Sequence, residues 1–336
     1  MTRLNSVATA IAAAALLASS FVSADHHGGA HASSITKIDS NEFGIDSKEI
    51  ADINAQMQAA VDGGFIAGNI LLVGNSEGVG VLETAGTQGP GQSTPMDEQT
   101  FFRIYSMTKP IVSVATMTLV EDGLLAISDP VSKYIPEFAN MTVINEETGA
   151  ITPAANEMTV QDLLTHESGL IYGIFDPESE LGKMYFQAGS LRSDITALTL
   201  AQNLAALPLR FEPGTKWNYS RSTDVLGAVI EVAAGKPLDA LLNERIFAPL
   251  GMDETTFFVD VSKAARIAHP IHGEMADPTV VTPMLSGGGG LHSTTEDYVR
   301  FASMLLAGGE YNGTRILEAD TLLAMQKKFI GEDVDR

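Results

Sequence analysis

The segment that most constrains this chain is residues 100–122, where a strand-like pattern changes into a helical one. "TFFRIY" is rich in aromatic and β-branched residues and predicts a short strand, whereas the apolar positions that follow recur at helical spacing until Gly123. Pro110 fixes where the helix begins, because a proline, which has no N–H, is tolerated only in the first turn. Ser106 is therefore expected at or next to the start of a helix.

The remaining chain shows strand signals early and helix signals late. Residues 47–62 predict a helix, and residues 68–86 predict two strands joined by a glycine-rich turn. Residues 129–260 carry mainly helix signals, including a capping pair, Thr159 and Asp162, before a helix that should stop near Gly169. A further helix is expected before Gly308. This order predicts a mixed α/β (α+β) fold with a large, mostly helical insertion.

The N-terminus predicts export. Residues 1–24 combine a basic start at Arg3, an apolar run and small residues before Asp25, which is typical of a secretory signal peptide in a periplasmic or extracellular bacterial protein. Residues 25–45 are small and polar and predict a flexible leader, so the domain proper should be residues 46–336. The leader histidines, His26, His27 and His31, could chelate a metal, but such a tract is more often disordered.

Composition excludes several classes of function. The chain has no cysteine, so it has no disulfide, thiol nucleophile or thiolate metal site. Its formal net charge of −22 would repel nucleic acid and anionic lipid, which argues against both as partners. The mature chain has no apolar run long enough to span a membrane. A small-molecule substrate fits these limits.

Ser106 and Lys109 form the leading candidate for a catalytic pair. Residues three apart lie on one face of a helix, so this hydroxyl and this amine can meet. A lysine can act as the base when burial or a nearby cation lowers its pKa from about 10.4. The backbone N–H of Ser106, at the helix start, could also bind an oxyanion. The alternative is a capping serine followed by a solvent-facing lysine; Ser34 and Lys37 share the spacing but lack the strand and the apolar helix.

Other candidate residues are less specific. Tyr219 lies in a loop before a predicted helix and could relay a proton, although a packing role is the alternative. Ser76 matches a nucleophile elbow, but the residues after it predict a strand, so it should be a turn residue. His166 and His292 lie at element boundaries and suggest capping or packing. The glycine run 287–290 lacks the lysine of a phosphate-binding loop.

Five segments in order resemble the serine β-lactamase and penicillin-binding-protein superfamily, and most closely its class C β-lactamase-like branch, the family VIII carboxylesterases. The resemblance implies an antiparallel sheet flanked by helices. It further implies that Ser106 is the acylated nucleophile, Lys109 its base, Tyr219 the third catalytic residue and the Ser106 N–H an oxyanion donor, without metal or cofactor. The segments are "FRIYSMTKPIVSVATMTLVEDGLLAISDPVSKYIPEF", "MTVQDLLTHESGLIYG", "FEPGTKWNYSRSTDVLGAVIE", "IFAPLGM" and "SGGGGLHSTTEDYVRFASMLLAGGEYNGTRIL".

Two departures from that family pattern refine the expectation. Arg221 stands where lactamases and peptidases usually have an asparagine that contacts the substrate amide, and Tyr172 resembles the esterase branch. Both are candidate substrate-binding residues, and they favour small carboxylic esters; a β-lactamase, a D-Ala-D-Ala peptidase and a non-catalytic binding protein are the alternatives. The third family box is also missing after Gly313. The C-terminal strands are therefore expected to be absent, as in a truncated chain.

Overall fold

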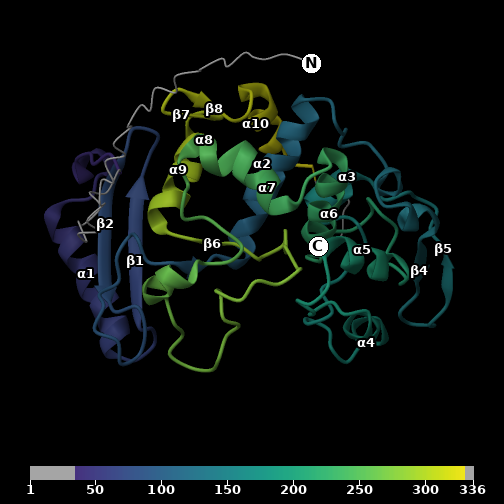
Figure 1. Cartoon of the computed structure of the whole chain (residues 1–336), viewed down its shortest axis with the longest axis horizontal. Helices are drawn as coiled ribbons and strands as arrows, with labels where there is room; N and C mark the ends of the chain where they lie inside the picture. The colour runs from purple at the N-terminus through teal and green to yellow at the C-terminus, as the bar shows by residue number, and fades with distance from the viewer. Residues whose placement is uncertain (1–34, 330–336) are drawn as a thin grey trace, which may run out of the picture. The chain divides into compact units, whose positions relative to one another are not determined.

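The computed structural model describes residues 35–329, and its N-terminal part is a helix packed on a β-hairpin (Figure 1). Helix α1 (Ser47–Asp62) lies against β2 (Val79–Gly86), which pairs antiparallel with β1 (Gly68–Gly74). These elements match the predicted helix and the two predicted strands. The predicted signal peptide lies outside the described residues.

Residues 35–45, the C-terminal part of the predicted flexible leader, make contacts with the domain. Ile35 is buried, and Ile38 N–H donates to the Val79 carbonyl at the end of the hairpin. A 3₁₀ turn follows at Ser40–Phe43. The segment is held by burial of the Ile35 side chain and by backbone hydrogen bonds to Val79 at the start of β2. A polar composition alone did not predict these contacts. Residues 25–34 lie outside the described part.

The predicted strand "TFFRIY" is short and does not join the hairpin. Strand β3 (Phe102–Arg103) pairs antiparallel with β6 (His292–Ser293), nearly two hundred residues later. A 3₁₀ turn (Tyr105–Met107) then leads into α2 (Thr108–Glu121), which ends before Gly123. The pairing brings the glycine run 287–290 next to the start of α2.

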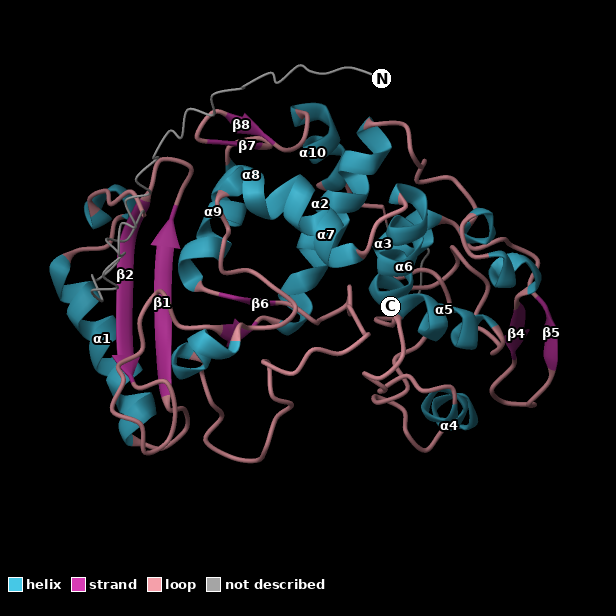
Figure 2. Ribbon diagram, in the orientation of Figure 1, coloured by secondary structure: helices cyan, strands magenta, loops and turns pink. Residues whose placement is uncertain are grey.

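The rest of the chain is largely helical and surrounds α2, which is buried along most of its length (Figure 2). Helix α6 (Ser222–Ala234) packs against α2, α3 (Val160–Thr165) and α5 (Ala197–Ala205) and has an equally buried face. The remaining elements are β4 (Thr142–Ile144), β5 (Ile151–Pro153), α4 (Glu180–Gln187), α7 (Leu238–Leu242), α8 (Ala248–Leu250), α9 (Thr295–Leu306), β7 (Glu310–Tyr311), β8 (Thr314–Arg315) and α10 (Ala319–Met325).

Helix ends follow the predicted signals with one informative difference. The Thr159–Asp162 capping box is present at the start of α3. That helix ends at His166, with φ 61°, rather than near Gly169. A left-handed histidine therefore ends the helix, a conformation that is uncommon outside glycine and asparagine. None of the helices within residues 35–329 is both long and apolar enough to cross a membrane.

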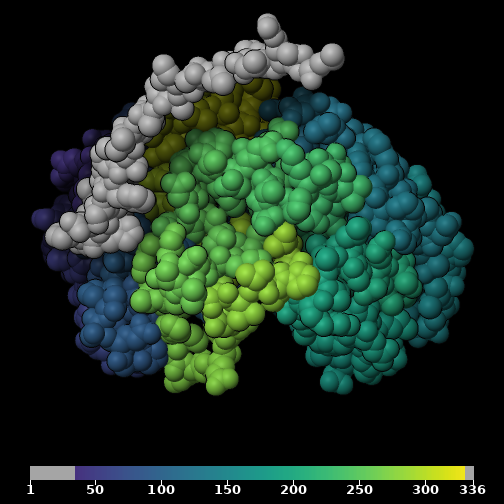
Figure 3. All heavy atoms as spheres, in the orientation of Figure 1, coloured from purple at the N-terminus to yellow at the C-terminus, as the bar shows by residue number. Residues whose placement is uncertain are grey.

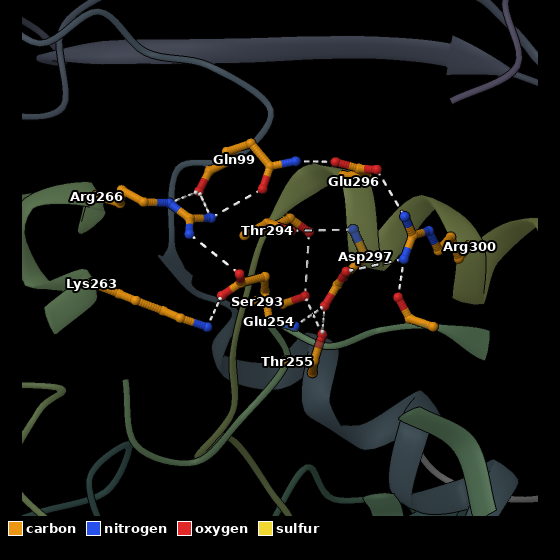
Figure 4. Close-up of polar contacts among 11 residues, drawn as sticks. Gln99, Glu254, Thr255, Lys263, Arg266, Ser293, Thr294, Glu296, Asp297 and Arg300 are labelled. Atoms are coloured by element: carbon orange, nitrogen blue, oxygen red, sulfur yellow. Dashed lines mark hydrogen bonds and ion pairs between the residues drawn. The ribbon is translucent and has the colours of Figure 1, made fainter. Parts of the chain in front are cut away.

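A buried polar network anchors the start of α9 and with it the β3–β6 pair (Figure 4). The Asp297 carboxylate accepts from Glu254 N–H at 2.8 Å and from the Thr255 hydroxyl at 2.9 Å. Thr294 caps the helix by accepting from Asp297 N–H. Arg266 donates to the Gln99 carbonyl at 2.7 Å, which ties the segment before β3 to the same region. These bonds tie the start of α9, which follows β6 directly, to residues 254–255.

Candidate active site

Ser106 is presented on a sharp turn between β3 and α2. The preceding residue, Tyr105, has φ 44°, in the left-handed region that non-glycine residues seldom occupy. Such a backbone costs on the order of 1–3 kcal/mol and persists where the surrounding structure imposes it. Ser106 follows in the 3₁₀ turn and is exposed. Its hydroxyl therefore projects from a fixed turn toward solvent.

Lys109, in the first turn of α2, reaches Ser106 as the spacing predicted. Its Nζ lies 3.1 Å from Ser106 Oγ. The same group donates to the Gly288 carbonyl at 2.6 Å and to the Tyr172 hydroxyl at 3.3 Å. These two acceptors hold the amine in place beside Ser106, so the pair is not a solvent-facing lysine beside a capping serine.

Tyr219 approaches the same oxygen from the loop before α6. Its hydroxyl donates to Ser106 Oγ at 2.6 Å, and its ring lies under Lys109 with Nζ 4.6 Å from the centroid. The ring also stacks on Tyr172, with 5.4 Å between centroids. The structure thus brings together the three residues that the sequence singled out, and it places Tyr172 as a wall behind them.

Arg221 is largely buried and is held by contacts within the fold. One guanidinium nitrogen lies 3.1 Å from an Asp224 carboxylate oxygen, and another donates to the Ser190 carbonyl. The guanidinium carbon lies 4.8 Å from the centroid of the Tyr172 ring. Burial, with a further contribution from the Asp224 charge, strongly raises the pKa of the Tyr172 hydroxyl, which stays protonated. Arg221 therefore supports the wall of the site.

Gly288 and Asp224 complete the site, and the sequence did not single them out. Asp224, buried in α6, accepts from the Ser286 hydroxyl at 2.5 Å and from Gly288 N–H at 3.1 Å. A side chain at position 288 would place its Cβ 2.7 Å from the Asp224 carboxylate. The glycine is thus needed for the close approach that aims its carbonyl at Lys109. The run of glycines before a helix start was the available signal.

Among the described residues, the other sequence candidates make no contact with Ser106 Oγ. Ser76 sits in the turn between β1 and β2, as expected. His292 in β6 has its Nδ1 3.1 Å from the Phe257 carbonyl oxygen and lines the cleft described below. The described residues contain no group of three or more His, Asp or Glu arranged to hold a metal. His166 contacts Tyr219 instead: its ring centroid lies 4.8 Å from that of Tyr219. A histidine assigned only to capping or packing is therefore part of the site.

A cleft adjoins the nucleophile turn. Figure 3 shows a hollow in the surface between the yellow-green and the teal parts of the chain. The cleft has a volume of about 510 Å³, and its lining comes mainly from residues 274–292. Tyr105, Ser286 and Gly289 are among the lining residues, and Phe257, Met275 and Met284 are among its apolar walls. Because Tyr105 directly precedes Ser106, this partly apolar cleft borders the nucleophile turn.

Comparison with known proteins agrees with this geometry. The family model described as Beta-lactamase matches residues 53–333. The chain is 32% identical over 295 residues to protein Rv1367c of Mycobacterium tuberculosis, covering 84% of this chain and 73% of the relative. It is 33% identical over 246 residues to esterase EstB of Burkholderia gladioli, covering 72% of this chain and 59% of EstB.

A solved structure shows the same fold. EstCE1, described as a hydrolase with promiscuous acyltransferase activity, superposes with a TM-score of 0.66 at 26% identity, over 82% of this chain and 75% of that one. Together with the family match over most of the chain, this confirms the fold that the ordered motifs predicted. The chain belongs to the beta-lactamase family and is a serine hydrolase of the superfamily that includes the family VIII esterases.

Proposed function

We propose that the chain hydrolyses small carboxylic esters through an acyl-serine intermediate, with Ser106 as nucleophile and Lys109 and Tyr219 as its proton-transfer partners. The observation that carries this proposal is the double contact at Ser106 Oγ, 3.1 Å to Lys109 Nζ and 2.6 Å to the Tyr219 hydroxyl. A serine hydroxyl is a weak nucleophile until a neighbouring base takes its proton.

The arrangement supports a two-step acyl transfer. With Lys109 in its amine form, Ser106 Oγ attacks the ester carbonyl carbon while its proton passes to Nζ, and the Ser106 N–H faces the developing oxyanion. The C–O bond to the alcohol then breaks, and a proton delivered through Tyr219 leaves with the alcohol. Water attacks the acyl-serine, gives its proton to the same pair, and releases the acid and the free serine.

Esters fit this site better than amides or lactams. Lactamases and peptidases of this superfamily usually have an asparagine that contacts the substrate amide where this chain has Arg221, and Arg221 is held by Asp224 and Ser190. Exposed aromatic rings flank Tyr219: Phe175 is 64% exposed and Trp217 is 36% exposed. An uncharged ester with an apolar group matches this rim, and EstB, a relative at 33% identity, is named as an esterase.

The test is hydrolysis of p-nitrophenyl butyrate by the purified chain and two serine variants. We expect Ser106→Ala to lose at least about 10³-fold in kcat/KM, because no other group can form the acyl intermediate. Ser76→Ala is the matched control, since Ser76 lies in the β1–β2 turn, and it should retain wild-type activity. Turnover that survives Ser106→Ala would overturn the mechanism.

A β-lactamase or D-Ala-D-Ala peptidase of the same fold is the competing function. Nitrocefin turnover and labelling by a fluorescent penicillin distinguish it from an esterase. We expect p-nitrophenyl butyrate to be the better substrate by kcat/KM. A nitrocefin kcat/KM that exceeds the ester value would assign the chain to the lactamase function instead.

A further inference from the structure

His166 holds the loop that carries Tyr219 at both neighbours of that residue. Its carbonyl accepts from Asn218 N–H at 2.9 Å, and its ring Nδ1 accepts from Ser220 N–H at 3.3 Å. The ring itself packs against the ring of Tyr219 and lies 6.3 Å from that of Trp217. One residue at the end of α3 therefore contacts four consecutive residues, 217–220.

A chain of buried hydroxyl groups fixes the orientation of this histidine. Leu170 N–H donates to Ser168 Oγ at 3.1 Å, Ser168 and Ser222 are 2.7 Å apart, and Ser222 and Ser220 are also 2.7 Å apart. Ser220 Oγ ends the chain 3.3 Å from His166 Nδ1. The Ser220 N–H also points at Nδ1, at 3.3 Å, which makes Nδ1 an acceptor. The ring proton is then on Nε2.

We infer that His166 is a positioning residue, which holds the Tyr219 hydroxyl against Ser106 by accepting hydrogen bonds at Nδ1 and by packing on the Tyr219 ring. The inference rests on the proposed function, because it assigns to His166 the geometry of a residue proposed to transfer protons. His166 acts through Tyr219 and the loop.

The environment of the ring favours the neutral, accepting form. Burial, reinforced by the positive charge of Lys109 and opposed by Asp224, lowers the pKa of His166 to about 4. The imidazole is thus neutral at pH 7 and Nδ1 remains available as an acceptor. A positively charged ring would place an N–H against the N–H of Ser220, which would repel the loop.

Two substitutions separate the acceptor from the backbone conformation. His166→Gly keeps the left-handed backbone but removes both the ring and the acceptor, whereas His166→Asn keeps an acceptor oxygen near the position of Nδ1 and tolerates φ 61°. A displacement of about 1 Å can cost about 10²-fold in rate. We expect His166→Gly to lose about 10²-fold in kcat on p-nitrophenyl butyrate, with KM changed less than about 3-fold, and His166→Asn to recover at least about 10-fold of that loss.

Trp217, the only tryptophan of the chain, reports on the loop independently of catalysis. We expect acrylamide to quench its fluorescence more strongly in His166→Gly than in the wild type or in His166→Asn. Without the imidazole, the loop loses the hydrogen bond at Ser220 N–H and the ring contacts that hold it. Asn312→Gly is the matched control. Asn312 is another left-handed residue, with φ 48°, in the turn between β7 and β8, and the change should alter neither quenching nor kcat.

The outcomes separate this inference from the proposed function. A wild-type chain without esterase activity, or activity that survives Ser106→Ala, contradicts the proposed function. Wild-type kcat and wild-type Trp217 quenching in His166→Gly overturn the positioning role alone. If thermal melting shows that His166→Gly does not fold, His166→Asn decides: a folded variant with kcat within about 10-fold of the wild type supports the role of the acceptor, and a larger loss contradicts it.

Discussion

At the scale of single residues, the site depends on two side chains that both contact the hydroxyl oxygen of Ser106. Ser106 Oγ contacts Lys109, three positions away, and Tyr219, 113 positions away. The first contact could be predicted from the sequence, because helix geometry alone places i and i+3 on one face. The second could not be derived from local pattern, and only the resemblance to a known family connected Tyr219 to the nucleophile.

The buried neutral histidine makes stability depend on pH. The pKa of His166 is about 4 in the folded chain and near 6.5 when unfolded, so the unfolded chain binds more protons between these values. The stabilisation is complete above pH 6.5 and is lost as the pH falls through 4. We expect wild type to lose about 2 kcal/mol more than His166→Asn in the free energy of unfolding between pH 7 and 4.5.

Urea denaturation of both proteins at the two pH values measures this difference. The comparison with His166→Asn is needed because carboxyl groups also titrate toward pH 4.5; burial, for example, raises the pKa of each of Asp162, Glu231 and Asp297 above its usual range. These groups are common to both proteins and cancel. Equal losses in the two proteins would show that His166 is not buried in its neutral form.

At the scale of elements, local signals located most helices and missed how they are connected. The predicted helix over residues 47–62 and the capping box of α3 are confirmed because both depend on neighbours in sequence. The pairing of β3 with β6 depends on residues almost two hundred positions apart, and two residues are too few to show a strand period. The role of the glycine run could not be predicted locally, because Asp224, which accepts from the Gly288 N–H, lies in α6, 64 positions earlier.

The close contact of Gly288 with α6 leads to a prediction at this scale. In Gly288→Ala the new Cβ would meet the Asp224 carboxylate at 2.7 Å, so the segment must shift and its carbonyl would move away from Lys109 Nζ. We expect kcat/KM on p-nitrophenyl butyrate to fall by about 10-fold or more. Gly289→Ala is the matched control, because its Cβ would have no neighbour closer than 3.5 Å, and it should lose much less. Equal losses would contradict the assigned contact.

At the scale of the whole molecule, the order of the motifs predicted more than any single motif did. The Ser-x-x-Lys spacing occurs at Ser106 and again at Ser34, so spacing alone could not choose between them. A preceding strand, an apolar helix and four further segments in order selected Ser106, and the family match over residues 53–333 confirms that choice of fold. Composition did not identify the reaction. The negative net charge argues against certain partners and the absence of cysteine excludes thiol chemistry, but neither points to a particular activity.

The central claim is that Ser106 is the nucleophile of this chain, and covalent labelling tests it most directly. The folded chain is treated with a fluorophosphonate probe, digested and analysed by peptide mass spectrometry. We expect one phosphonylated serine, Ser106, with labelling abolished by Ser106→Ala and slowed at least about 10²-fold by Lys109→Met, which removes the base. Labelling of another serine in its place, or a folded chain that the probe does not label, would contradict the claim.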